Sequence, residues 1–176
     1  MKLKNLKKTP FEIAEKLIIT DKVEKLLARD NILKLLFNDE DSALNKEVSA
    51  TTIEYLIQND YIGFYPATES GINNIERNTF LIINFEDFNF QNTDNNTSVS
   101  GAIYITTDKN HCLLENKKLR LLELIDSIET MLEGEKLSSA GQIRLTSANY
   151  VVFSDFRCGY RINFRINDQA TRKAEL

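Results

Sequence analysis

The segment that ends near residue 167 alternates between apolar and polar side chains more regularly than any other part of the chain. Successive side chains of a β-strand point to opposite faces of the sheet, so this pattern predicts a strand with one apolar and one polar face. Such strands belong to antiparallel sheets whose second face meets water, a lumen or a partner. The apolar set is Tyr160, Ile162, Phe164 and Ile166, and the polar set is Arg161, Asn163, Arg165 and Asn167.

A helical segment earlier in the chain is suited to cover the apolar face of that sheet. Over residues 115–133 apolar residues recur at helical spacing, and Gly134 ends the pattern. A helix with so wide an apolar face needs a sheet to pack against. We therefore predict an α+β fold in which one long amphipathic helix covers an antiparallel β-sheet. The predicted strands are residues 61–65, 79–85, 99–107, 142–146, 150–153 and 159–166.

Helix start signals place short N-terminal helices before the sheet. Thr9-Pro10-Phe11-Glu12 combines a hydroxyl cap, an early proline and a glutamate that can complete a capping box, so a helix should cover residues 10–19. Further short helices are predicted after Thr20 or Asp21, at residues 31–37, and after a second capping box at Thr51-Thr52-Ile53-Glu54. We expect residues 1–60 to form a helical segment packed on the core, residues 61–170 to form that core, and residues 171–176 to form a tail.

Charge and cysteine usage narrow the classes of function. A formal net charge of -4 argues against a protein whose main task is to bind nucleic acid, because phosphate binding depends on clustered Lys and Arg. We interpret the lysines of residues 1–8 as a solvated arm. The two cysteines, Cys112 and Cys158, are expected to be incidental thiols in a reducing compartment. Apolar runs far shorter than about 20 residues predict neither a signal peptide nor a membrane span.

No group of residues in the sequence predicts catalysis. His111 is the only histidine, and its neighbour Cys112 should point away from it, so a Cys/His nucleophile is not expected. His111, Cys112 and Cys158 lack a fourth ligand at the usual spacing for zinc. The glycines are isolated, and none forms a phosphate-binding loop. We therefore expect no enzyme, no cofactor and no metal.

The order of elements over residues 61–168 carries a resemblance to a known family. An aromatic segment ending in Pro66 leads to a strand, a long loop and a second strand, Ile103-Tyr-Ile-Thr-Thr107. A helix follows, from Lys118-Leu-Arg-Leu-Leu to Met131-Leu-Glu-Gly134, and Gly159-Tyr-Arg-Ile-Asn-Phe-Arg-Ile-Asn-Asp168 closes the order. In this respect the chain resembles the tail terminator and neck proteins of tailed bacteriophages.

The resemblance implies a structural protein that forms a hexameric ring at the phage neck. Such a ring caps the tail tube, stops its polymerisation and joins the tail to the capsid connector. Its partners would be copies of itself, the tail tube protein, the sheath and the connector proteins, with DNA passing through the lumen without sequence-specific binding. It would be assembled in the cytoplasm of the bacterial host and would remain in the neck of the virion.

Candidate interface or lumen residues come from the arginines of the last strands and from the Asn-rich segment at residues 89–98. Arg161 and Arg165 would either meet DNA in the lumen or pair with acidic groups of an adjacent subunit, and we favour the pairing. An alternative function is a small binding module for single-stranded nucleic acid, which would use the basic N-terminal arm and the Arg-bearing last strand. The candidate residues are Arg144, Arg157, Arg161, Arg165, Asn92, Asn95 and Asn96.

Overall fold

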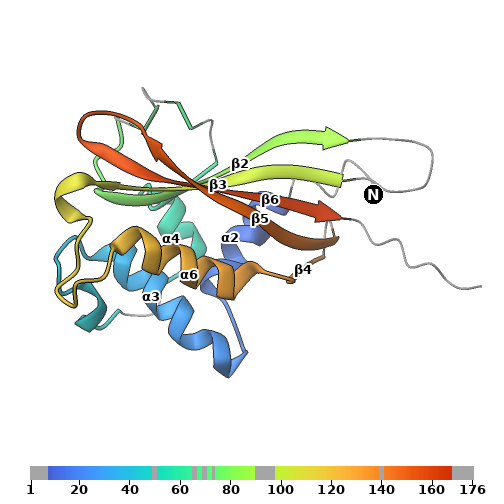
Figure 1. Ribbon diagram of the computed structural model, residues 1–176. Coiled ribbons are helices and arrows are strands. Elements are labelled where there is room, and N and C mark those ends of the chain that lie inside the picture. The colour runs from blue at the N-terminus through green and yellow to red at the C-terminus, as the bar shows by residue number, and fades with distance from the viewer. Residues whose placement is uncertain are drawn as a thin grey trace, which may run out of the picture.

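A six-stranded sheet packed against a layer of helices forms the protein (Figure 1). The computed structural model describes residues 8–48, 51–64, 67–68, 71–72, 74–89, 98–138 and 141–167. The strand order is β1-β2-β3-β6-β5-β4. All neighbouring strands are antiparallel except β1 and β2, which are parallel. The strands are β1 (Ile62–Gly63), β2 (Thr79–Asn89), β3 (Ser98–Asp108), β4 (Lys136–Leu137), β5 (Gly141–Val152) and β6 (Arg157–Asn167).

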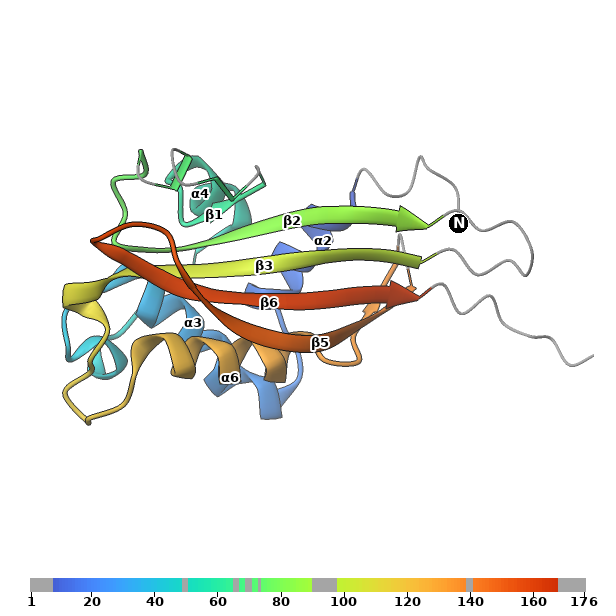
Figure 2. The ribbon, with the colours of Figure 1, turned by 45° about the horizontal axis from the view of Figure 1, so that its top comes forward.

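Helices cover one face of the four long strands, β2, β3, β6 and β5 (Figure 2). The described helices are α2 (Thr9–Ile18), α3 (Leu26–Phe37), α4 (Ile53–Gln58) and α6 (Arg120–Leu132), with short 3-10 turns η1 (Val23–Lys25), η2 (Ala43–Asn45) and η3 (Lys109–His111). Among the described residues, none of these helices is long and apolar enough to cross a membrane.

The predicted α+β class is confirmed, but the prediction of one long covering helix is wrong. α6 has 13 residues and shares the face of the sheet with α2 and with α3, which has 12 residues. The predicted helix at residues 115–133 starts late because Leu113 forms a β-bridge with Leu119 and Lys117 adopts a positive φ of 63°. Residues in the left-handed region do not continue an α-helix.

The bounds of two other elements, β5 and α3, also differ from the prediction. The two strands predicted at residues 142–146 and 150–153 are one strand, β5, because a bulge between Leu145 and Ser147 keeps its pairing with β6. The helix predicted at residues 31–37 begins earlier, at Leu26, directly after η1. The helix start predicted within Thr51-Thr52-Ile53-Glu54 is found, and Thr52 is the residue that caps α4, since its hydroxyl accepts a hydrogen bond from the Tyr55 amide at 3.3 Å.

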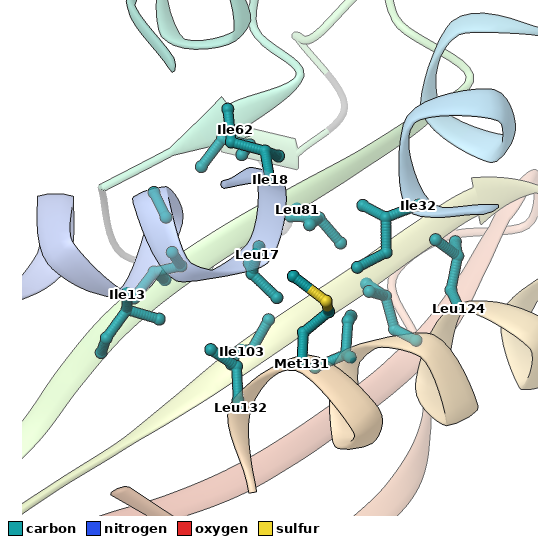
Figure 3. Close-up of a cluster of buried hydrophobic side chains, with 14 of the residues drawn as sticks. Ile13, Leu17, Ile18, Ile32, Ile62, Leu81, Ile103, Leu124, Met131 and Leu132 are labelled. Carbon is teal, nitrogen blue, oxygen red and sulfur yellow. The ribbon is translucent and has the colours of Figure 1, made fainter. Parts of the chain in front are cut away.

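The main core lies between the helices and the sheet. Leu17 of α2, Ile32 of α3 and Met131 of α6 meet over Leu81 and Ile103 of the sheet, as Figure 3 shows. Burying a side chain of this size contributes about 1.5–3 kcal/mol, so contacts among three helices and two strands hold the layers together. On β6 the alternation predicted from sequence holds as far as residue 166, because its apolar set lies in this core and Arg161, Asn163 and Arg165 lie on the opposite face.

The opposite face of the sheet is covered over only part of its length. A second, smaller apolar cluster packs there, at the end where β2 begins and β3 ends. It does not reach the far half of the strands, where Ser100 and Arg165 face each other across β3 and β6. That half of the face therefore presents polar side chains. The buried members of the smaller cluster are Ile72, Ile75, Phe80, Ile82 and Phe153.

Arg120, the first residue of α6, is fully buried and joins three segments of the chain. Its guanidinium donates hydrogen bonds to four backbone carbonyls, at distances of 2.7–2.9 Å. Burial lowers the pKa of Arg120, while Asp39 and Asp41 favour its charged form. The side chain therefore clamps the end of α3 and the following loop to the start of α6. The accepting carbonyls belong to Leu35, Asn38, Glu40 and His111.

Candidate assembly surface

β5 forms an open edge of the sheet. β6 pairs with β5 on one side, but on the other side β4 reaches only Gly141 and Gln142 among the described residues. The Phe153 amide donates to the Arg157 carbonyl at 3.1 Å, so by alternation the backbone groups of residues 147, 149 and 151 also point toward β6. The N–H and C=O groups of Ala148, Tyr150 and Val152 therefore point outward, away from β6.

The side chains along this edge are exposed and uncharged. Tyr150 is 56% exposed and Val152 is 58% exposed, and Phe156 in the turn after the strand is 72% exposed. Residues 147–152 contain no charged residue and no proline. Soluble proteins commonly protect edge strands with lysine, proline or a covering segment. None of these protects this stretch within the described part of the chain, so its outward groups can pair with another strand.

The opposite side of the sheet has a second open edge, on β2. Among the residues that the structure describes, β1 pairs only with Leu81 and Ile82. The Leu81 amide donates outward, to the Tyr61 carbonyl at 2.9 Å, so by alternation the backbone groups of Ile83 also point outward. Through the three antiparallel pairings between them, β2 and β5 run in opposite directions. The β5 edge of one copy can therefore meet the β2 edge of another as an antiparallel pair.

The polar face of the sheet contains an internally paired arginine. Arg161 forms an ion pair with Glu86 of β2, and its Nε donates to the Tyr104 hydroxyl at 3.0 Å. Asn163 donates to the Ser147 hydroxyl at 2.7 Å. Arg165 is exposed and forms no ion pair with any described residue. This face is thus polar with little unpaired charge.

The structure places the remaining candidate residues in different settings. Arg157 donates to the carbonyls of Arg77 at 2.8 Å and Ile75 at 2.7 Å, so it fastens that segment to the sheet. Burial lowers the pKa of Arg157. Arg144, at the start of the β5 edge, pairs with Glu133 at 2.8 Å. The predicted interface roles of the four arginines stay predictions, and Asn92, Asn95 and Asn96 lie outside the described residues.

Sequence reasoning missed that the two cysteines are neighbours. The sulfurs of Cys112 and Cys158 lie 3.4 Å apart, although the residues are 46 positions apart in the chain. The alternation of β6 puts Cys158 on the apolar face with Tyr160, but nothing local indicates where Cys112 folds. Among the described residues, no group of three or more His, Cys, Asp and Glu side chains is arranged to hold a metal ion.

Together these features define an α+β protein with an open-edged sheet and a half-covered polar face. The family model named YomW matches residues 29–166, well over half of the chain. The chain therefore belongs to the YomW family, a phage-like family of the SPbeta prophage type. No curated protein matches the sequence.

Proposed function

We propose that this protein is a structural ring component of a phage neck, which caps the tail tube, stops its polymerisation and joins the tail to the capsid connector. The open β5 edge carries the proposal, because its outward backbone groups and exposed apolar side chains suit pairing with a second copy. Membership of a phage-like family supports the setting.

The two open edges favour a ring over a two-fold dimer. A contact between β5 of one copy and β2 of the next joins two different surfaces, and such head-to-tail contacts close into a ring when the rotation between copies allows it. Each added copy keeps its helices on the same side of the joined sheet, because β2 and β5 run in opposite directions. The polar faces of all copies then line one common surface.

The charges on that polar surface suit a passage for DNA. A strongly basic lumen would bind the phosphates of the DNA, since unpaired Lys and Arg side chains drive binding to the nucleic-acid backbone. Here Glu86 pairs with Arg161, Asn163 and Ser147 are uncharged, and Arg165 is the one arginine of β6 on this face that forms no ion pair with a described residue. DNA would pass such a surface without being held, and the acidic partner of Arg161 is supplied by its own chain.

One substitution on β5 separates assembly from folding. Proline at Ala148 removes an outward N–H and leaves the bonds to β6 in place, and prolines are tolerated on edge strands in that orientation. Lysine at Thr130, an exposed position of α6, is the control. Mass photometry should find hexamers for the natural sequence and for Thr130→Lys, and monomers with an unchanged circular dichroism spectrum for Ala148→Pro.

The capping function needs a second assay, with tail tube protein of the same phage. Addition of the natural protein should stop tube elongation at substoichiometric amounts, and Ala148→Pro should not. An Ala148→Pro variant that assembles and caps like the natural protein would rule out the β5 edge. A natural protein that stays monomeric and neither binds tube protein nor stops its elongation would rule out the ring.

The alternative, a module for single-stranded nucleic acid, has less support from the described residues. Arg144 and Arg161 are paired with carboxylates, and Arg157 is held by backbone carbonyls. The shift of a labelled single-stranded oligonucleotide by the protein, measured at low salt, distinguishes the two functions. A salt-dependent shift would favour nucleic-acid binding, and no shift would remove it.

A further inference from the structure

Cys112 and Cys158 bring two free thiols together beneath the end of the sheet where β6 begins. Cys158 lies on β6 opposite Thr107 of β3 and is 4% exposed, and Cys112 follows η3 and is half-buried. Their sulfurs are 3.4 Å apart. A disulfide bond is about 2.05 Å long, so the sulfurs need to approach by about 1.4 Å.

We propose that this pair is a site of oxidation, at which a small-molecule disulfide converts the two thiols into an intrachain disulfide. The Cys112 thiolate attacks one sulfur of the reagent, forms a mixed disulfide and releases one reagent thiolate. The Cys158 thiolate then attacks the Cys112 sulfur and releases the second. The protons of both cysteines end on the two reagent thiols, and the two electrons that the cysteine sulfurs give up reduce the reagent disulfide.

The positions of the two thiols set the order of the steps. Cys112 is the more exposed, so an external reagent reaches it first. Cys158 is fixed within β6 and is poised to resolve the mixed disulfide. The Cys112 carbonyl accepts a hydrogen bond from the Arg120 amide at 2.8 Å, so closure depends on rotation of the Cys112 side chain rather than on movement of its backbone.

The surroundings of Cys112 make its reaction with a disulfide reagent slow at neutral pH. Burial, and then the neighbouring Cys158, raise the pKa of Cys112 to about 12. Asp108 at the end of β3 acts in the same direction, Arg120 of α6 acts against it, and the Tyr150 hydroxyl of β5 interacts with both thiols. Because the thiolate is the attacking form, the rate should rise about tenfold per pH unit below that pKa. The pair should stay reduced in a cytoplasm and close slowly in oxidising surroundings.

The bond would tie the start of β6 to the segment before α6. The closed loop contains α6, β4 and β5, so it includes the open edge of the sheet. Closing a loop of this size restricts the unfolded chain, and the melting temperature should rise by roughly 5–15 °C. This inference does not rest on ring assembly, and its test uses the full-length chain alone.

The test is incubation of the reduced protein with oxidised glutathione at pH 9, followed by intact-mass measurement. The natural protein should lose about 2 Da, as expected for an intrachain disulfide. Cys158→Ser should accumulate the glutathione adduct at Cys112, and Cys112→Ser should stay unmodified while folded. The rate for the natural protein should be roughly 100-fold lower at pH 7.

Two results would overturn the inference. One is a natural protein that keeps the glutathione adduct and never closes the bond. The other is a natural protein whose thiols stay reduced at pH 9 although both react in urea. The Cys112→Ser and Cys158→Ser variants keep a side chain of similar size, and their circular dichroism spectra should match the natural protein before the reagent is added.

Discussion

Replacing Arg120 by methionine should lower the free energy of unfolding by about 3–5 kcal/mol. The guanidinium makes four charge-assisted hydrogen bonds to backbone carbonyls, each contributing about 1.5–3 kcal/mol. The desolvation cost of the buried guanidinium also disappears in the variant, and this offsets part of the free energy lost with the hydrogen bonds. Methionine keeps most of the apolar volume, so the loss reports mainly on the carbonyls left without a donor.

Urea denaturation followed by far-ultraviolet circular dichroism measures the loss, since the chain has no tryptophan. The control is Arg144→Met, which removes one exposed ion pair to Glu133 and should cost less than about 1 kcal/mol. Arg120→Lys should fall between the two, because an ammonium group has three donors and cannot reach four carbonyls. An Arg120→Met variant within about 1 kcal/mol of the natural protein would refute the clamp.

Three further predictions concern buried or ionic contacts. Burial alone would raise the pKa of Glu135, but hydrogen bonds from Lys22 and Lys25 lower it to about 2, below the unfolded value. Its contribution, about 1–2 kcal/mol after allowance for solvent, should be present above about pH 4.5 and lost as pH falls toward 2, and Glu135→Gln should remove that part of the pH dependence of unfolding. Thr106→Val should stabilise by up to about 1 kcal/mol, measured in urea, because its buried hydroxyl has no partner among the described residues. Gly159→Ala should cost about 3 kcal/mol or more in the same assay, because its Cβ would lie 2.0 Å from the Ile105 carbonyl oxygen.

Each of these expectations has a clear contrary result. A Glu135→Gln variant with the same stability profile as the natural protein between pH 6 and pH 2 would show that the lysine contacts do not stabilise the fold. A Thr106→Val variant that loses stability would point to a partner for the hydroxyl. A Gly159→Ala variant as stable as the natural protein would mean that β3 and β6 can separate locally.

Local patterns predicted those parts of the fold that depend on neighbours in sequence. The alternation of β6 and the hydroxyl cap at Thr52 follow from backbone geometry over a few residues, and both are found. The prediction of a long helix over residues 115–133 was wrong because Lys117 adopts a left-handed conformation, which helix propensities do not indicate. The burial of Arg120 could have been predicted from the sequence, since Arg120 falls on the same helical face as Leu124 and Ile128, which are both buried.

The candidate sites depend on contacts between distant segments, and sequence gave little sign of them. β5 and β2 lie at open edges because of the order of the strands in the sheet. Short sequence patterns do not predict which strands pair. The Cys112–Cys158 contact joins the segment after β3 to the start of β6 in the same way. Arg161 was predicted from its polar face, but its acidic partner, Glu86, lies on a strand 75 positions away.

Hydrogen exchange at single amides tests the pairing of β5 most directly. In the assembled protein, the outward amides of Tyr150 and Val152 should exchange at least tenfold more slowly than the same two amides in the Ala148→Pro monomer. The inward amide of Asn149 should change much less. Equal exchange at residues 150 and 152 in both forms would contradict the account, because it would leave the edge of β5 exposed to water in the assembly.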